Sequence, residues 1–317
     1  MAESKTVGKA PRLYVQGPNS CSVWQSSTYR KTIVVFGEAH EGKVACATTT
    51  AGTMRIDQFL QYLFREELPT TKLDCFVEAP FLKGKEQRGG IVPRTDTVNL
   101  VHVWAAFAEC LQVSKTKCPY KNVRMHYVDV RRLTTSPSIR ALMKWIEERS
   151  ISDEDLEMLC DSGAMEVLLR DIKFDIQLAS IRYVEVRRAL FTYWIKHVKE
   201  ALENICQELE NLTLATLLLK LLAVSVRIMD AYLLARIFRC FADGEEPENV
   251  VVIVGNDHAA NVERFLHEEL KTFEQPVPRV VSPHKCLDLS NHDWRMIFAP
   301  FPAAAAARKP CPKIKRK

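Results

Sequence analysis

The chain has 317 residues, of which 47% are hydrophobic, and its 44 basic residues against 39 acidic ones give a net charge of only +5. This composition predicts a globular protein with a sizeable core. Part of the positive charge lies in residues 308–317, so the sequence argues against a basic face that would bind nucleic acid.

The ten cysteines form no CxxC motif, and several lie in apolar stretches, as Cys75 does. This distribution predicts buried free thiols in a reducing compartment, rather than a disulfide framework or a zinc site. Residues 1–11 contain no apolar signal region. The most apolar run, residues 212–226, is short and contains Lys220, so it predicts a buried helix and no membrane span.

From these features we expect a cytoplasmic protein. The basic residues 313–317 could alternatively direct it to the nucleus. A loose N-terminal arm is expected over residues 1–30, with one short strand near residues 13–15. A disordered basic tail is expected over residues 300–317.

Between these ends, β-branched and aromatic runs alternate with amphipathic ones. The first kind predicts strands at 32–36, 73–77, 123–128, 249–254 and 278–282. The second kind predicts helices at 53–68, 97–113, 139–149, 153–160, 165–188, 191–209, 212–241 and 259–273.

This alternation predicts an α/β fold with a mostly parallel sheet flanked by helices. Residues 137–241 contain no candidate strand, so we expect an all-helical insertion between the third and fourth strands. Residues 31–299 would form a single α/β domain that includes this insertion. Residues 81–95, rich in glycine and basic side chains, are expected to form a long loop or lid.

Polar side chains follow the predicted strands at the point where each strand ends. Glu38 and His40 follow the first strand, and Glu78 follows the second. Asp129 follows the third strand and His258 the fourth. Because open parallel sheets bind ligands outside the carboxyl ends of their strands, we expect these residues to line one crevice.

Two of the strands end in the same motif, Gly-x-x-His, at residues 37–40 and again at residues 255–258. Gly37 and Gly255 lie where a strand must turn sharply and where the backbone could approach a ligand closely. Two copies of this short motif, each after an apolar strand, indicate a shared site.

Two neutral imidazoles with one or two carboxylates suit Zn, Mn, Co or Fe. Such an ion could lower the pKa of a bound water and produce a hydroxide nucleophile. Without a metal, His40 could act as a general base held by Glu38 or Glu78 and direct water at an ester or amide.

Several candidates also have a structural interpretation. His40 could hydrogen-bond its own loop, and His258 could be simply a residue in the first turn of a helix. Asp129 could form a structural ion pair with a neighbouring arginine. His102 and His126 are set among apolar residues and are expected to be core or surface histidines without a catalytic role.

The paired Gly-x-x-His motifs, with Glu78 after a strand between them, resemble the arrangement of the TIKI/TraB superfamily. This group includes erythromycin esterase-like and ChaN-like haem-binding proteins. The chain also resembles uncharacterised members of the group from large DNA viruses. The resemblance spans residues 31–282 and implies an α/β core with a helical insertion and a polar site between the two histidines.

Carried residue by residue, the resemblance implies His40, His258 and Glu78 as metal ligands. It implies Glu38 as a further carboxylate partner, and His40 and His258 as bases if no metal is bound. Gly37, Gly255 and Asp129 would lie beside the bound group.

The resemblance also implies an arginine from a helix as an anion or oxyanion clamp. Arg236, in the apolar helix that precedes the fourth strand, is one candidate, because a charged group in so apolar a helix needs a partner. Arg55 is the other.

The leading hypothesis is a metal-assisted hydrolase that uses Mn, Co or Zn against an ester or amide of a small molecule or peptide. One alternative is a haem- or metal-binding protein without turnover. Another is a catalytically degenerate viral structural or host-interaction protein, which would be found in the virion. The apolar helices of the insertion could also form a homodimer interface.

Overall fold

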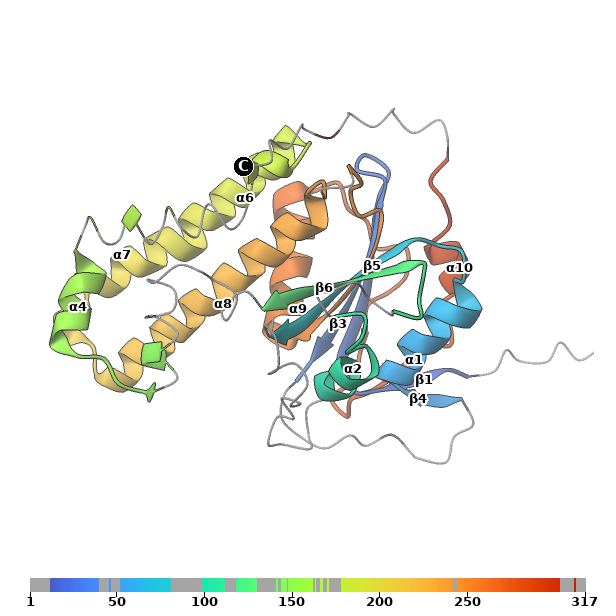
Figure 1. Cartoon of the computed structure of the whole chain (residues 1–317), viewed down its shortest axis with the longest axis horizontal. Helices are drawn as coiled ribbons and strands as arrows, with labels where there is room; N and C mark the ends of the chain where they lie inside the picture. The colour runs from blue at the N-terminus through green and yellow to red at the C-terminus, as the bar shows by residue number, and fades with distance from the viewer. Residues whose placement is uncertain are drawn as a thin grey trace, which may run out of the picture.

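A computed structural model describes residues 12–39, 46, 52–80, 99–111, 118–129, 141, 144–146, 148–161, 163, 166–167, 170, 178–241, 244–302 and 311. The predicted loop at residues 81–95 lies outside these residues. The chain forms mixed sheets flanked by helices, which confirms the predicted α/β class (Figure 1).

The main sheet has six strands in the order β6-β5-β7-β3-β2-β8. Parallel pairing joins β6 to β5, β5 to β7, and β7 to β3, whereas β2 and β8 pair antiparallel. Their bounds are Ser20–Ser26 (β2), Lys31–Glu38 (β3), Leu73–Pro80 (β5), Val123–Asp129 (β6), Asn249–Gly255 (β7) and Val280–Val281 (β8). All five predicted strands are therefore confirmed.

A smaller sheet has the order β4-β1-β9 and brings together three distant parts of the chain. Its strands are Tyr14–Gln16 (β1), Thr53–Arg55 (β4) and Cys286–Asp288 (β9). The sequence predicted only the first of them.

Helices occupy both faces of the main sheet and also extend away from it (Figure 1). Their bounds are Ile56–Tyr62 (α1), Leu100–Ala106 (α2), Asp153–Cys160 (α4), Val184–Trp194 (α6), Glu200–Gln207 (α7), Leu214–Phe238 (α8), Asn256–Arg264 (α9) and Trp294–Ile297 (α10). π-Helical turns continue α1 over Leu63–Glu67 and α9 over Phe265–Leu270, and another joins α6 to α7 over Ile195–Lys199. Short 3₁₀ turns lie at Leu178–Ser180 and Leu209–Asn211.

The helix predictions locate these segments but misjudge some of their ends. The break expected between helices 165–188 and 191–209 is absent, because residues 189 and 190 lie inside α6, which continues through the π-helical turn into α7. The helix expected from residue 53 begins instead at Ile56, because the three residues before it pair with β1.

Alternating side chains of the central strands pack into two cores, one on each face of the sheet. On β3, Ile33 and Val35 pack with α6, α8 and α9. Val34 and Phe36 point to the other face and pack with α1, α2 and α10. Burial on both faces explains why these strands read as continuous apolar runs.

The predicted loose arm is wrong for the described part of residues 1–30. Ser20–Ser26 forms β2, which pairs with β3 along its whole length. The strand is rich in serine, and two of its three serines have partners. Ser22 Oγ donates to Glu263 Oε1 at 2.8 Å and Ser26 Oγ accepts from the Tyr29 N–H, whereas Ser20 Oγ is buried without a hydrogen bond to the described residues. Burial with hydrogen bonds lets a polar sequence occupy a central position.

Cysteine pairing also differs from the prediction of free thiols. Four disulfides join Cys46 to Cys286, Cys110 to Cys118, Cys160 to Cys206 and Cys240 to Cys311. Cys21 and Cys75 are free and buried, as expected, and burial raises the pKa of both thiols. Because the paired cysteines are distant in sequence, apart from Cys110 and Cys118, their spacing does not reveal the pairing.

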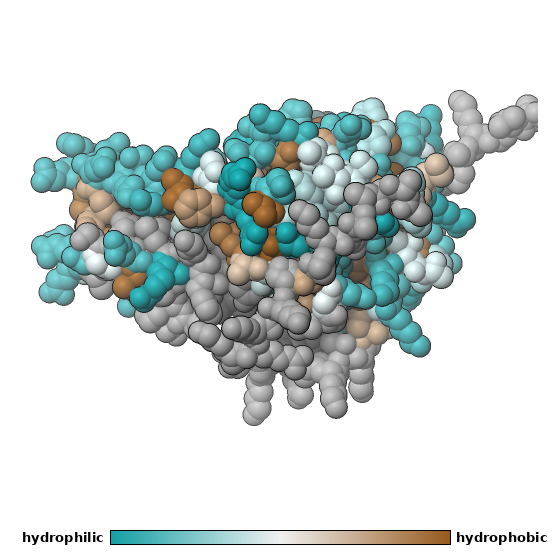
Figure 2. Space-filling model, turned by 90° about the horizontal axis from the view of Figure 1, so that it is seen from above, coloured by the Kyte–Doolittle hydropathy of each residue, from teal (hydrophilic) through white to brown (hydrophobic). Residues whose placement is uncertain are grey.

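Within the described ranges, no helix combines the length and apolarity that crossing a bilayer requires. The long helix α8 is nevertheless only partly buried. Leu214, Leu219 and Leu222 are exposed, so the prediction of a buried helix over residues 212–226 holds for one face only. Figure 2 shows apolar groups among the hydrophilic ones on the described surface.

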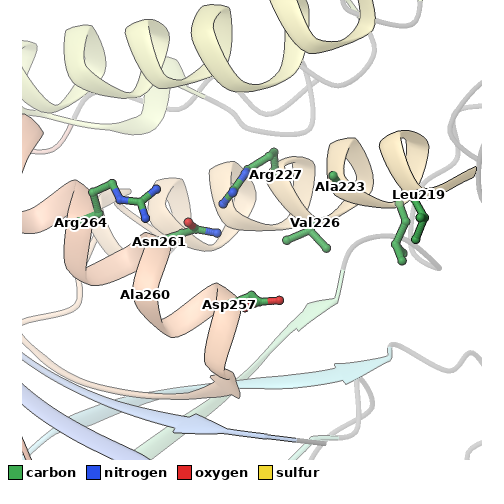
Figure 3. A pocket seen from close by; sticks show the side chains of 9 residues that line it. Leu219, Ala223, Val226, Arg227, Asp257, Ala260, Asn261 and Arg264 are labelled. Atoms are coloured by element: carbon green, nitrogen blue, oxygen red, sulfur yellow. The ribbon is translucent and has the colours of Figure 1, made fainter. Parts of the chain in front are cut away.

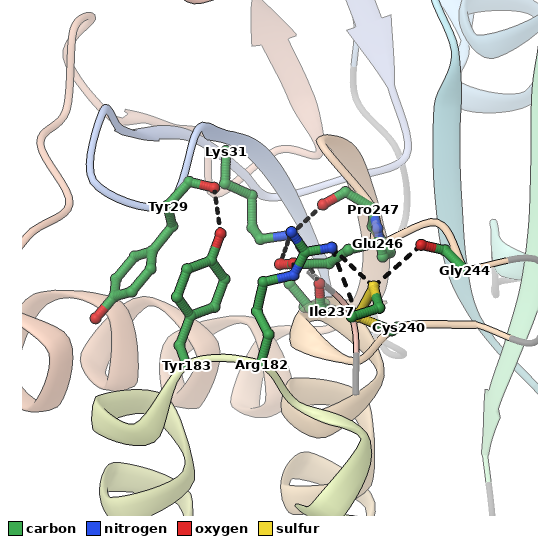
Figure 4. The surroundings of a disulfide bond; sticks show 10 residues. Tyr29, Lys31, Arg182, Tyr183, Ile237, Cys240, Gly244, Glu246 and Pro247 are labelled. Carbon is green, nitrogen blue, oxygen red and sulfur yellow. Dashed lines mark hydrogen bonds and ion pairs between the residues drawn. A yellow bond between two sulfur atoms is a disulfide. The ribbon is translucent and has the colours of Figure 1, made fainter. Parts of the chain in front are cut away.

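A buried ion cluster fastens the start of β3 to the end of α8 (Figure 4). Glu246 lies 2.9 Å from Lys31 Nζ and 2.8 Å from Arg182 Nε, and all three side chains are almost inaccessible to solvent. Lys31 also donates to the carbonyl oxygens of Ile237 and Pro247. One carboxylate thus neutralises two buried cations.

The disulfides predict a definite thiol count. Under denaturing conditions without a reductant, only Cys21 and Cys75 should react with an alkylating reagent, whereas all ten cysteines should react after reduction. Mass spectrometry of the alkylated peptides measures this directly. Ten reactive thiols in the unreduced protein would contradict the assigned pairing.

The Glu246→Ala substitution should lower the free energy of unfolding by about 3–5 kcal/mol, because it removes the carboxylate that two buried cations share. Urea denaturation measures the loss. The matched control is Glu245→Ala, which removes an exposed contact with Lys72 and should cost less than about 1 kcal/mol. Equal losses for the two variants would show that the buried cluster contributes nothing beyond a surface pair.

Candidate functional site

The carboxyl ends of three neighbouring parallel strands bring Glu78 and the second Gly-x-x-His motif together beside the end of β3. In the β3–β7 pair, Glu38 lies opposite Gly255. On the other side of β7, the Gly255 N–H donates to Glu78 Oε2 at 2.7 Å. The two Gly-x-x-His motifs therefore begin side by side, with Glu78 bound to the second one.

Gly37 is required by packing at this edge. A Cβ atom at Gly37 would lie 2.6 Å from both Asn256 Oδ1 and Ser20 Oγ. The first motif thus allows α9 to begin directly against β3. This contact gives a packing reason for the glycine and differs from the ligand approach expected from the sequence.

His258 lies in the first turn of α9, is buried, and contacts two carboxylates. Its Nδ1 lies 2.6 Å from Asp230 Oδ1, and its Nε2 lies 3.5 Å from Glu78 Oε1. Burial disfavours a charged imidazole, but the hydrogen bonds and charges of Asp230 and Glu78 outweigh it and raise the pKa of His258 to about 9. The ring is held in one orientation by carboxylates from two other elements, α8 and β5.

Asp230, the partner that sequence reasoning missed, is fully buried in α8. Besides His258, its carboxylate accepts from Asn261 Nδ2 at 2.7 Å, from the Tyr193 hydroxyl at 3.2 Å and from Arg227 at 3.4 Å. The sequence did contain a signal for Asp230, because an aspartate in the middle of an apolar helix is buried and a buried charge requires partners.

Glu38 is positioned at the same edge, but its carboxylate serves another helix. It accepts from the backbone N–H groups of Asn99 at 2.5 Å and Leu100 at 2.9 Å, where α2 begins. The Asn99 side chain donates to it as well, at 3.2 Å. A carboxylate is favourable there because the first N–H groups of a helix have no partner within the helix.

Arg236 belongs to a separate cluster on β6. Its guanidinium donates to the Tyr232 hydroxyl and to His126 Nδ1, both at 2.9 Å. The other ring nitrogen of His126 lies 2.7 Å from Asp74, which also pairs with Arg124. These contacts tie Arg236 to the middle of the sheet edge instead of to His258.

His126 is a core histidine, as the sequence suggested. Its ring stacks between Phe76 and Phe241. Burial lowers its pKa to about 4, and the charge of Arg236 acts in the same direction, while Asp74 opposes the shift. The imidazole is therefore neutral at physiological pH.

The remaining candidates are accounted for as follows. Arg55 forms a bidentate pair with Asp57 at the start of α1 and is positioned by that contact. Asp129 is buried at the end of β6, opposite Pro80. His40 lies outside the described residues, so its position relative to His258 stays a prediction.

Chemically, the described part of the site is an imidazole fixed by one buried carboxylate and facing a second. Within the described ranges, no group of three metal-ligating side chains comes together. The pair formed by His258 Nε2 and Glu78 Oε1 nevertheless fits two ligands of one ion. Two ligand atoms about 2.1 Å from a tetrahedral ion lie about 3.4 Å apart, close to the observed separation.

Comparisons of the chain with family models, with curated proteins and with solved structures found no significant match.

The shifted pKa of His126 predicts a pH-dependent stability. An imidazole with a pKa near 6.5 when unfolded and about 4 when folded takes up its proton preferentially in the unfolded chain, so stability falls as the pH drops below about 6.5. Between pH 7 and pH 5 the loss should be about 2 kcal/mol, at ~1.4 kcal/mol per unit of pKa.

Urea denaturation of a His126→Gln variant at both pH values should show this part of the decline removed. The control is His267→Gln, which changes an exposed histidine and should leave the decline intact. A His126→Gln variant with the wild-type pH dependence would mean that the ring carries its proton in the folded state.

Proposed function

We propose that the chain is a metal-assisted hydrolase-like protein whose site lies at the carboxyl ends of β3, β7 and β5. The observation that carries the proposal is the Asp230–His258–Glu78 arrangement, in which a buried carboxylate orients an imidazole and a second carboxylate faces its free edge. Carboxylate–histidine–metal triads have this layout.

In this proposal, His258 Nε2 and Glu78 Oε1 hold the ion, and His40 from the neighbouring strand end supplies a third ligand. The bound ion, which we take to be Mn, Co or Zn, would lower the pKa of a coordinated water and make it nucleophilic at neutral pH. The resemblance to the TIKI/TraB superfamily supports the same assignment.

The protein's own residues would perform three tasks. Asp230 fixes the ring of His258 through Nδ1, so that Nε2 points at Glu78. The Gly255 N–H holds one oxygen of Glu78 and leaves the second directed at His258. Burial of this pair excludes bulk water, which strengthens its electrostatic effect on an ester or amide carbonyl.

Glu38 and Arg236 have smaller parts than their sequence positions suggested. Glu38 anchors α2 beside the strand ends and so shapes the rim of the site. Arg236 orients His126, and we assign it no contact with the reacting group.

We further propose that the helices between β6 and β7 form an insertion and that they select the small molecule or peptide that reaches the strand ends. The four disulfides favour folding under oxidising conditions. We therefore propose that the chain folds in an oxidising compartment and not in the reducing cytoplasm that the sequence predicted.

A metal- or haem-binding role without turnover would use the same residues. The burial of His258, which is only 4% exposed, favours this second candidate, because a substrate needs access to the ion.

Metal content after dialysis against Mn, Co or Zn tests the proposal, with one ion per chain expected. His258→Ala and Glu78→Gln should abolish binding. Asp230→Asn should weaken it about 10–100-fold, because it disturbs only the orientation of the ring. Asp74→Asn is the matched control, since it alters a second buried aspartate–histidine pair outside the site and should leave binding unchanged.

Unchanged metal content in His258→Ala would refute the assigned ligands. A panel of chromogenic esters and amides then separates the two candidates. Metal-dependent turnover that is lost with His258→Ala supports the hydrolase. Stoichiometric metal or a Soret band without turnover supports the binding protein instead.

A further inference from the structure

A cavity of about 340 Å³ lies between the first half of α8 and the helix α9 (Figure 3). Its walls carry apolar side chains from α8 and mostly polar ones from α9. None of the proposed metal ligands lines it, so the site proposed above does not account for it.

The apolar wall comes from Leu219, Leu222, Ala223 and Val226. Their spacing of three and four residues places them on one face of α8. Leu219 is 67% exposed and Leu222 is 40% exposed, although large apolar residues rarely stay uncovered in a cluster. This wall therefore offers a surface that an apolar ligand could cover.

The polar end of the cavity contains two guanidinium groups, Arg227 and Arg264. Arg227 lies 3.4 Å from the buried Asp230, whereas no carboxylate of the described residues lies within ion-pair distance of Arg264. The guanidinium groups of Arg227 and Arg264 lie on the two sides of Asn261, so the two cations share one end of the cavity (Figure 3).

Asn261 fixes this polar end in place. It is almost fully buried and donates to the same oxygen of Asp230 that Arg227 contacts. The position of the two side chains is thus set by Asp230, and a ligand would meet an organised cationic end.

The cavity is also lined by Asp257, seven residues before Arg264 along α9; its carboxylate lies across the cavity from Arg227 and Val226, whereas Leu219 lies at the far end (Figure 3). Seven residues of helix correspond to about 10 Å. A negative charge at that distance would repel a second acidic group on a ligand whose first acidic group lies at the arginines.

From these features we infer a binding site for a small amphipathic anion with one acidic group. A carboxylate would contact Arg227 and Arg264, and an unbranched apolar chain would cover Leu219, Leu222 and Val226. Guanidinium groups bind carboxylates with charge-assisted hydrogen bonds, and burial of the exposed leucines adds a hydrophobic contribution. This ligand site goes beyond the proposed hydrolase and does not depend on it.

Titration of the full-length protein with octanoate, followed by calorimetry, tests the inference. Octanoate should bind at one site per chain, and octanedioate and octanol should each bind about tenfold more weakly or not at all. The second carboxylate of the diacid would lie among the leucines without a cation to pair with, and the alcohol lacks the charge that the arginines require.

Arg264→Gln and Leu222→Ser should each weaken octanoate binding about tenfold. Both residues are at least partly exposed, so the variants should keep the wild-type fold. Arg279→Gln is the matched control: it removes a surface arginine that pairs with Glu263 outside this cavity, and its affinity should equal that of the wild type.

Glu78→Gln, which alters a proposed metal ligand without touching Asp230, should bind octanoate as the wild type does, and this separates the inference from the proposed hydrolase. Three results would overturn it: no binding of octanoate, equal affinity for octanoate and octanedioate, or wild-type affinity in Arg264→Gln.

Discussion

The position of β7 between β3 and β5 is the constraint on which the rest of the structure depends. Parallel pairing on both sides fixes the register, so the last residues of three strands that are distant in sequence arrive at one edge. Gly255 then receives Glu78 from one neighbour and faces Glu38 on the other. A shift by one residue would exchange the side chains of β7 between the two cores and also dismantle the site.

Charge inside this protein follows one pattern, in which a buried carboxylate is shared by several donors from different elements. Glu246 joins β3 to the end of α8, Asp74 joins β5 to β6, and Asp230 joins α8 to α9. Sharing satisfies more of the lone pairs of each carboxylate, which offsets the cost of removing it from water. The candidate site is thus one of three related clusters and differs from the others by its place at the strand ends.

Sequence reasoning could locate the strands that are buried on both faces, because the residues on both faces of such a strand are apolar and the strand appears as a continuous apolar run. It could also assign Glu78 and His258 to strand ends. It could not find β2, a serine-rich strand that is nevertheless buried, or Asp230, which reaches His258 from a helix 28 residues earlier. Contacts between residues that are far apart in the chain produce no recognisable spacing in the sequence. The disulfides could not be predicted for the same reason.

The disulfide between Cys46 and Cys286 makes most of the protein a covalent ring, since it closes a loop of 240 residues. The described strands from β4 to β8 and the described helices from α1 to α9 lie within that ring. A single proteolytic cut inside it would open the ring yet leave one connected molecule, so the two fragments would separate only after reduction. In a chain-entropy description, a loop of this size disfavours the unfolded state by about 5 kcal/mol. The protein is therefore tolerant of a break in its backbone in a way that a linear chain is not.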